Sequence, residues 1–270
     1  MPHIAAIQMS SSSALGMNLI ALRKHVANAA SQGAKLIVLP DRFALFSPES
    51  NDYAANKEIL TEGRIQLYLQ KLCLSYNVWI IASGVPLYCE YDAKRFYLAT
   101  LVFDNKSELI DVYYHLKPQI PLTGHARSLV FEDQSFGSKV VIIQTPFGKV
   151  GLASNYDLLV PEYFRYMSAQ GAQIFAVSAA ISSDFADYWM MVLKTRALEN
   201  SAYMVVANQC GYHEDMARLN HGNSMILDAG ANLLSHCDVG ESVLMSHIDC
   251  ELRTKMSFDY NPFQLQYRRK

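Results

Sequence analysis

The chain has 270 residues, of which 51% are hydrophobic and 18% are charged, and this composition is typical of a globular protein. Its formal net charge of −2 gives no basic excess for a polyanion, so a nucleic-acid partner is excluded at this level. No apolar run approaches the ~18 residues that a membrane-spanning helix needs, and we expect no membrane partner.

The predicted elements alternate between short β-branched apolar runs and longer segments of helical period. In the first half we predict two helices and five strands: residues 18–32 and 64–76 are helical, and His3–Met9, Lys35–Leu39, Val78–Ser83, Tyr97–Phe103 and Leu109–Tyr114 are strands. In the second half we predict helices and strands in the same rhythm: Pro161–Gln170 and Trp189–Asn200 are helical, and Val140–Gln144, Val150–Ser154, Ile174–Ser178, Tyr203–Asn208, Ser224–Asp228 and Ser246–Asp249 are strands. This alternation, with hairpins mixed in, predicts a layered α/β fold with mixed sheets. We expect one domain over residues 1–270, with residues 252–270 as a C-terminal tail.

The five cysteines are scattered along the chain and form no CxxC pair. This pattern favours reduced thiols over a disulfide framework or a structural metal site. The N-terminal segment MPHIAAIQMSSSS lacks the basic and apolar regions of a signal peptide. We therefore expect a cytoplasmic protein without a cofactor or a metal.

Polar residues gather in three loops that each follow a predicted strand, which is where layered α/β proteins usually place their sites. The loops are Leu39–Phe43, Tyr113–Lys117 and Ser154–Asp157.

The segments around these loops resemble those of the nitrilase, or carbon–nitrogen hydrolase, family. GAKLIVLPDRFALF is similar to the family segment that carries the general-base glutamate, and VGLASNYDLLVPEYFR to the one that carries the nucleophilic cysteine. RALENSAYMVVANQCG and HGNSMILDAGANLL match later family segments in the expected order. The resemblance runs from the first strand to about residue 252. It implies a four-layer α-β-β-α sandwich and a homodimer, or a larger even homo-oligomer, paired through outer helices.

The family's chemistry requires a thiolate that attacks an amide or nitrile carbon, a carboxylate that moves the proton and a lysine that stabilises the oxyanion. Carried over residue by residue, the cysteine position holds Asn155, the glutamate position holds Asp41 and the lysine position holds Tyr113. The auxiliary glutamate of the family maps to Glu132. All three members of the triad are therefore changed at the positions that the resemblance indicates.

These replacements predict that the familiar reaction is absent. A carboxamide at residue 155 has no usable lone pair for attack, and Asp41 withdraws its charge by one methylene, about 1.5 Å, where a displacement of about 1 Å can cost roughly 10²-fold in rate. Tyr113 can donate a hydrogen bond but supplies no positive charge. Losing one oxyanion donor typically costs about 10²–10³-fold.

Several neighbouring residues keep two interpretations. Asn155 is either a ligand-binding amide or a turn residue, and Asp41 is either a surviving base or a cap. Lys117 either reaches inward to replace the lysine or is a solvated loop residue. Tyr156 and Asp157, with Lys117, are candidate ligand-binding residues, although an acid such as Asp157 also suits the start of a helix.

Two other clusters are interpreted more simply. Arg196 and Glu199, three residues apart on one predicted helix, are expected to form an ion pair. His213 and His221 lie near two acids, but their spacing matches no standard metal-ligand pattern.

Three functional hypotheses follow. The first is a pseudoenzyme that keeps a pocket for a small-molecule ligand or acts as a partner scaffold. The alternative is an active C–N hydrolase, an amidase acting on a small amide, with machinery rebuilt around Asp41 and Glu132. The third is a structural subunit that partners an active paralogue.

Overall fold

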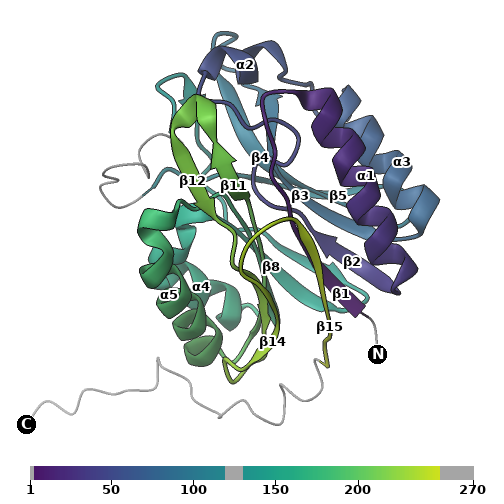
Figure 1. Cartoon of the computed structure of the whole chain (residues 1–270), viewed down its shortest axis with the longest axis vertical. Coiled ribbons are helices and arrows are strands. Elements are labelled where there is room, and N and C mark those ends of the chain that lie inside the picture. The colour runs from purple at the N-terminus through teal and green to yellow at the C-terminus, as the bar shows by residue number, and fades with distance from the viewer. Residues whose placement is uncertain (1–2, 119–129, 250–270) are drawn as a thin grey trace, which may run out of the picture.

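The computed structural model describes residues 3–118 and 130–249. Two mixed β-sheets pack face to face, and two pairs of helices cover their outer faces (Figure 1). The predicted α-β-β-α sandwich is therefore confirmed. The expected tail, residues 252–270, lies outside the described residues.

The first sheet contains seven strands in the order β15-β1-β2-β3-β4-β5, with β6 beside β4. Their bounds are β1 His3–Gln8, β2 Ala34–Val38, β3 Trp79–Tyr88, β4 Phe96–Phe103, β5 Leu109–Tyr114, β6 Gln134–Ser135 and β15 Ser242–His247. The last strand begins earlier than predicted and ends at His247. Its position is set by antiparallel pairing with β1, from His3 opposite His247 to Gln8 opposite Ser242.

The second sheet contains six strands in the order β14-β13-β10-β9-β8-β7. Their bounds are β7 Ile142–Thr145, β8 Gly148–Ser154, β9 Ile174–Ala179, β10 Tyr203–Asn208, β13 Ser224–Leu227 and β14 Leu233–Cys237. A separate hairpin consists of β11 (Cys210–His213) and β12 (Arg218–His221).

The helices lie outside the sheets, with α1 (Leu15–Ser31) and α3 (Arg64–Tyr76) on the first sheet (Figure 1). On the second sheet lie α4 (Pro161–Ala169) and α5 (Ala186–Asn200). A short helix, α2 (Ser50–Ala55), and three short 3-10 turns, η2 (Asn155–Leu159), η3 (Ser183–Phe185) and η4 (Glu214–Met216), complete the described elements. None of the helices within the described ranges is long and apolar enough to cross a bilayer.

Alternation along the strands explains the layering. On β1, Ile4 and Ala6 face the core between the sheets, whereas Ala5 and Ile7 face the helices α1 and α3. Both faces of the strand are apolar because both are covered, as expected for strands inside a layered α/β protein. The core between the sheets contains residues of both sheets, so the loops at the strand ends are held in fixed positions relative to each other.

A glycine on β3 sets the approach of one such loop. Gly84 has a φ of +78°, and a Cβ atom there would lie 2.3 Å from the backbone nitrogen of Arg42. It sits where the β3–β4 register shifts, between Ala82 and Val85. This close approach brings Asp41 and Arg42 beside β3.

We predict that Gly84→Ala destabilises the fold by about 1–3 kcal/mol, because the new methyl group clashes with backbone at a left-handed position. Gly16→Ala is the matched control, since no atom lies within 4 Å of a Cβ at that position. The free energy of unfolding in urea measures both. Equal stability of the two variants would contradict this account of Gly84.

Candidate functional site

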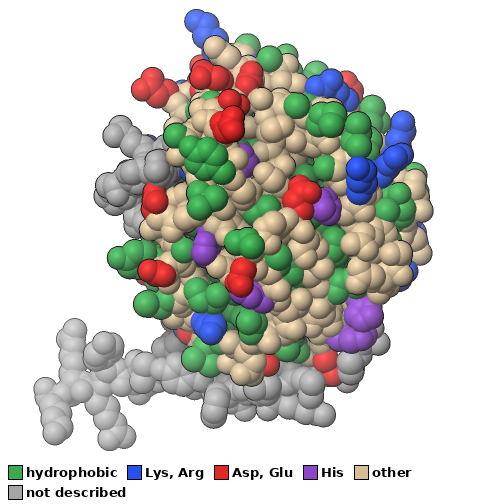
Figure 2. All heavy atoms as spheres, viewed as in Figure 1, with side chains coloured by type: hydrophobic (Ala, Val, Ile, Leu, Met, Phe, Trp, Pro, Cys, Tyr) green, Lys and Arg blue, Asp and Glu red, His purple; other side chains and the backbone are tan. Residues whose placement is uncertain are grey.

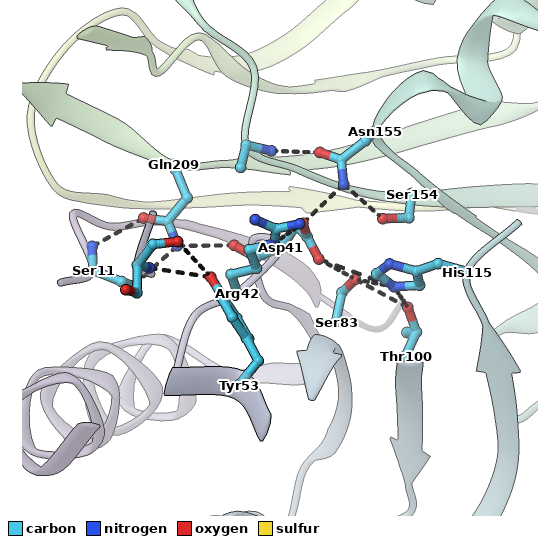
Figure 3. Close-up of polar contacts among 12 residues, drawn as sticks. Ser11, Asp41, Arg42, Tyr53, Ser83, Thr100, His115, Ser154, Asn155 and Gln209 are labelled. Atoms are coloured by element: carbon cyan, nitrogen blue, oxygen red, sulfur yellow. Dashed lines mark hydrogen bonds and ion pairs between the residues drawn. The ribbon is translucent and has the colours of Figure 1, made fainter. Parts of the chain in front are cut away.

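Three loops meet at one end of the sandwich, where Asp41, His115 and Asn155 point toward one another (Figure 3). Asp41 follows β2, His115 follows β5 and Asn155 follows β8. The predicted grouping of these loops is therefore seen in the structure. The contact crosses from the first sheet to the second.

Asp41 is fully buried and is surrounded by hydrogen-bond donors. The Ser83 hydroxyl donates to Oδ1 at 3.0 Å, and the Asn155 amide donates to Oδ2 at 2.8 Å. Arg42 Nε lies 3.5 Å from Oδ2. A buried carboxylate is tolerated when it is paired and hydrogen-bonded in this way.

Asn155 bridges the two sheets through both ends of its amide. Nδ2 donates to Asp41 and, at 3.1 Å, to the hydroxyl of Ser154, while Oδ1 accepts the backbone N–H of Ala180 at 2.8 Å. Its backbone has a φ of +47°, a left-handed conformation that asparagine tolerates better than most residues. Asn155 therefore acts both as a turn residue and as a polar link to Asp41.

Arg42 places a positive charge beside the pocket, and the sequence analysis did not single it out. The side chain is 2% exposed, and its guanidinium carbon lies 5.2 Å from the ring centres of Tyr53 and Phe131. Cation–π contacts of this kind stabilise a partly desolvated arginine. The signal in the sequence was a charged residue directly after Pro40–Asp41 at the end of an apolar strand.

His115 is buried among hydroxyl groups. Its Nε2 lies 3.1 Å from Ser83 Oγ and 3.3 Å from Thr100 Oγ1, and 4.0 Å from Asp41 Oδ1. Burial lowers the pKa of His115 to about 4, against the opposing effect of the Asp41 charge. The imidazole is therefore neutral at pH 7.

Tyr113 does not reach toward Asp41 as the resemblance to the lysine position suggested. Its hydroxyl donates to Asp157 Oδ2 at 2.5 Å, and its side chain has no exposed surface. Tyr113 and His115 project from the same face of β5, but only His115 lines the pocket. Burial raises the pKa of Tyr113 well above its usual value, so the phenol is a neutral donor.

The pocket between these loops has a volume of about 40 Å³. That volume holds a few water molecules and is small beside ligand pockets of about 300–1,000 Å³. Its lining combines charged, polar and apolar side chains: Arg42, His115, Leu116, Pro118, Val130, Gln134, Phe136, Ser154, Asn155, Tyr156 and Asp157.

Besides Asp41 and Tyr113, two further predicted site residues do not line this pocket. Lys117 is exposed beyond the end of β5, where strand alternation no longer directs its side chain inward. Glu132 is exposed outside the lining, and Gln134 supplies the pocket-facing side chain of that segment. Tyr156 and Asp157 line the pocket, and their role in ligand binding stays a prediction.

The ion pair predicted between Arg196 and Glu199 is confirmed, with Nη1 and Oε1 2.8 Å apart. Around His213 and His221, no group of three histidine, cysteine or acidic side chains within the described ranges could hold a metal ion.

The fold and the pocket define a nitrilase-type sandwich protein with a small polar site at the strand ends. The chain belongs to the carbon–nitrogen hydrolase family, whose model it matches over residues 3–257.

Curated relatives support this assignment. The chain is 32% identical over 247 residues to "Deaminated glutathione amidase" of Synechocystis sp., covering 89% of this chain and 88% of that protein. It is 27% identical to the Homo sapiens protein of the same name, covering 92% of this chain and 77% of that protein.

Solved structures show the same fold. The Caenorhabditis elegans NitFhit protein superposes with a TM-score of 0.84 at 23% identity, covering 94% of this chain and 62% of that one. Saccharomyces cerevisiae Nit3 superposes with a TM-score of 0.82 at 20% identity, covering 94% and 92%.

The comparisons contradict the expectation of a pseudoenzyme. Relatives at 26–32% identity, aligned over most of the chain, are named deaminated glutathione amidase. The expectation was wrong because it judged the site by three aligned positions. It did not take account of other polar groups around the pocket, such as Arg42, the neighbour of Asp41 in the same loop.

We predict that His115 makes the protein acid-sensitive. Its folded pKa of about 4 lies below the unfolded value of about 6.5, so the unfolded state takes up the proton first as the pH falls. The stability present above pH 6.5 is therefore lost progressively toward pH 4, by about 2 kcal/mol between pH 7 and pH 5.

Urea unfolding at pH 7 and pH 5 measures this loss, and His115→Gln should remove it. The same substitution at His25, on the outer helix α1, is the control and should leave the loss in place. Because burial raises the pKa of Asp157 to about 7, that residue changes the stability in the opposite direction over the same interval, and the contribution of His115 is the difference between wild type and His115→Gln at each pH. A difference between these two proteins that is equal at pH 7 and pH 5 would contradict the assignment.

Proposed function

We propose that this chain is an amidase that hydrolyses the C–N bond of a small amide. The observation that carries the proposal is the arrangement of Arg42 and Asn155 on the pocket, both held by the buried carboxylate of Asp41. The curated relatives named deaminated glutathione amidase support the reaction class. Deaminated glutathione is accordingly the first amide to test.

The machinery is rebuilt relative to a cysteine nucleophile. No cysteine is among the described residues that line the pocket, so we assign the attack on the carbonyl carbon to a water molecule. The Arg42 guanidinium supplies the positive charge that stabilises the oxyanion. Asp41 lies behind Arg42 and Asn155, away from the pocket, and holds these two side chains in place.

We predict that wild-type protein hydrolyses at least one member of a panel of small amides, with release of ammonia from primary amides and of the amine fragment from deaminated glutathione, and that Asp41→Asn lowers kcat/KM by at least about 10²-fold. The variant keeps the side-chain shape but removes the charge beside Arg42, so the oxyanion cation is misplaced. Asp111→Asn is the control, because Asp111 is exposed on β5. Absence of ammonia or amine release from every amide would refute the proposal, and an active Asp41→Asn would refute the role of Asp41.

We further propose a homodimer, or a larger even assembly, formed through α4 and α5. Support comes from large apolar side chains exposed on α5, namely Tyr188 (60%), Met191 (65%) and Leu198 (62%). Figure 2 shows hydrophobic side chains over the region of α5 on the face it presents. Several large apolar side chains exposed on one helix face are typical of a protein–protein interface.

Light scattering tests the assembly. Met191→Lys combined with Leu198→Lys should reduce the molecular mass to that of one chain. The control pair, Leu67→Lys with Leu74→Lys, charges similarly exposed positions on α3 and should leave the mass unchanged. A wild-type monomer would remove this proposal without affecting the amidase activity.

A cytoplasmic location is also proposed. The four cysteines within the described ranges, Cys73, Cys89, Cys210 and Cys237, are free thiols. Scattered free thiols suit a reducing compartment.

A further inference from the structure

Asp157 is the carboxylate that faces the pocket, whereas Asp41 lies behind it. Asp157 lines the pocket and is 9% exposed, while Asp41 is fully buried and does not line it. Both hydrogen bonds to the Asp157 side chain use Oδ2, which accepts from the Tyr113 hydroxyl at 2.5 Å and from the Ser154 backbone N–H at 2.7 Å. Within the described part of the chain, no hydrogen bond is made to Oδ1. This oxygen is therefore the atom left to meet a molecule in the pocket.

The surroundings of Asp157 allow it to exchange a proton near neutral pH. Burial raises the pKa of Asp157 to about 7, the charge of Asp41 raises it further, and the hydrogen bonds from Tyr113 and Ser154 oppose the rise. A group that transfers protons works best when its pKa lies near the working pH.

The other ionisable groups around Asp157 come from four elements. Tyr163 of α4 lies beside Tyr113, with ring centres 6.4 Å apart, and its hydroxyl donates to the carbonyl of Leu152. Arg196 of α5 donates to the carbonyl of Leu158 and pairs with Glu199, so its charge is engaged outside the pocket. Across the pocket lie Arg42 and the neutral His115.

We propose that Asp157 is the general base of the amidase reaction, an assignment that rests on the proposed function. Oδ1 takes a proton from the water molecule as its oxygen bonds to the carbonyl carbon, and the carbonyl becomes an oxyanion beside Arg42. The protonated Asp157 then gives that proton to the amide nitrogen. The C–N bond breaks as the carbonyl re-forms, which releases the amine and the carboxylic acid and returns Asp157 to its carboxylate form.

A purely structural role for Asp157 predicts something different. Ser154 and Asp157 form a reciprocal capping pair at the start of η2, and such pairs stabilise helix ends. If capping were the whole role, substitutions would change stability and leave the pH dependence of turnover unchanged. Tyr113 separates the two roles, because its hydrogen bond stabilises the charged form of Asp157 without taking part in the cap.

The test measures kcat/KM against pH for amide hydrolysis by the full-length wild-type protein, followed by the ammonia or amine released. Activity should rise with pH through a limb near pH 7, because the base must be ionised. Asp157→Asn should lose at least about 10²-fold at every pH. Tyr113→Phe should move the limb to higher pH, which lowers activity about 3- to 10-fold at pH 6 and leaves the plateau above pH 9 nearly unchanged.

Tyr163→Phe is the matched control, since it removes a buried phenol hydroxyl from the same core that does not donate to Asp157. Its limb should coincide with that of the wild type. Infrared spectra at pH 6 provide a readout without turnover: the band of a protonated carboxylic acid should be present in the wild type and absent in Asp157→Asn.

The outcomes separate the two proposals. If the wild type releases neither ammonia nor an amine from any amide, the proposed function fails and the assignment of Asp157 fails with it. If the wild type is active but Tyr113→Phe leaves the limb in place, or Asp157→Asn stays active, only the assignment of Asp157 is overturned. Should Asp157→Asn fail to fold, Tyr113→Phe against Tyr163→Phe still decides.

Discussion

The buried carboxylate of Asp41 is the interaction on which the arrangement of the site depends. Removing a charge from water is expensive, and this one is compensated by donors from both sheets, Ser83 from β3 and Asn155 from the end of β8. The loop that carries it is fixed as well, because Gln209 Nε2 donates to the Asp41 carbonyl at 2.9 Å. The two layers are thus joined at the strand ends by polar contacts with defined geometry.

Hydrophobic periodicity was sufficient to predict the helices and strands that are covered on both faces. The helix expected over residues 64–76 coincides with α3, and the strand expected over Tyr203–Asn208 coincides with β10. The hairpin β11–β12 was not predicted, because its strands lack an apolar alternation. It is held by contacts distant in sequence, such as Cys210 N–H with the carbonyl of Met9.

The site was predictable as a set of loops but not as a set of contacts. Asp41, Asn155 and His115 belong to loops that follow predicted strands, and such loops usually carry the site in layered α/β proteins. Side-chain direction could not be obtained in this way. Tyr113 turns to Asp157 and Lys117 points to solvent, and each outcome depends on packing between the two sheets.

Tyr113 and Asp157 are chemically linked, because the hydrogen bond from residue 113 affects the pKa of Asp157. A lysine at residue 113 within reach of the same carboxylate would form a buried ion pair, and an opposite charge would hold the pKa of Asp157 low. Tyr113 satisfies Oδ2 with a neutral donor, so burial dominates and the pKa of Asp157 rises to about 7. The replacement that removes a positive charge from the lysine position therefore leaves a second acid able to bind and release a proton at neutral pH. The positive charge of the pocket is then provided by Arg42, on the opposite loop, where it is separated from the proton-transfer group.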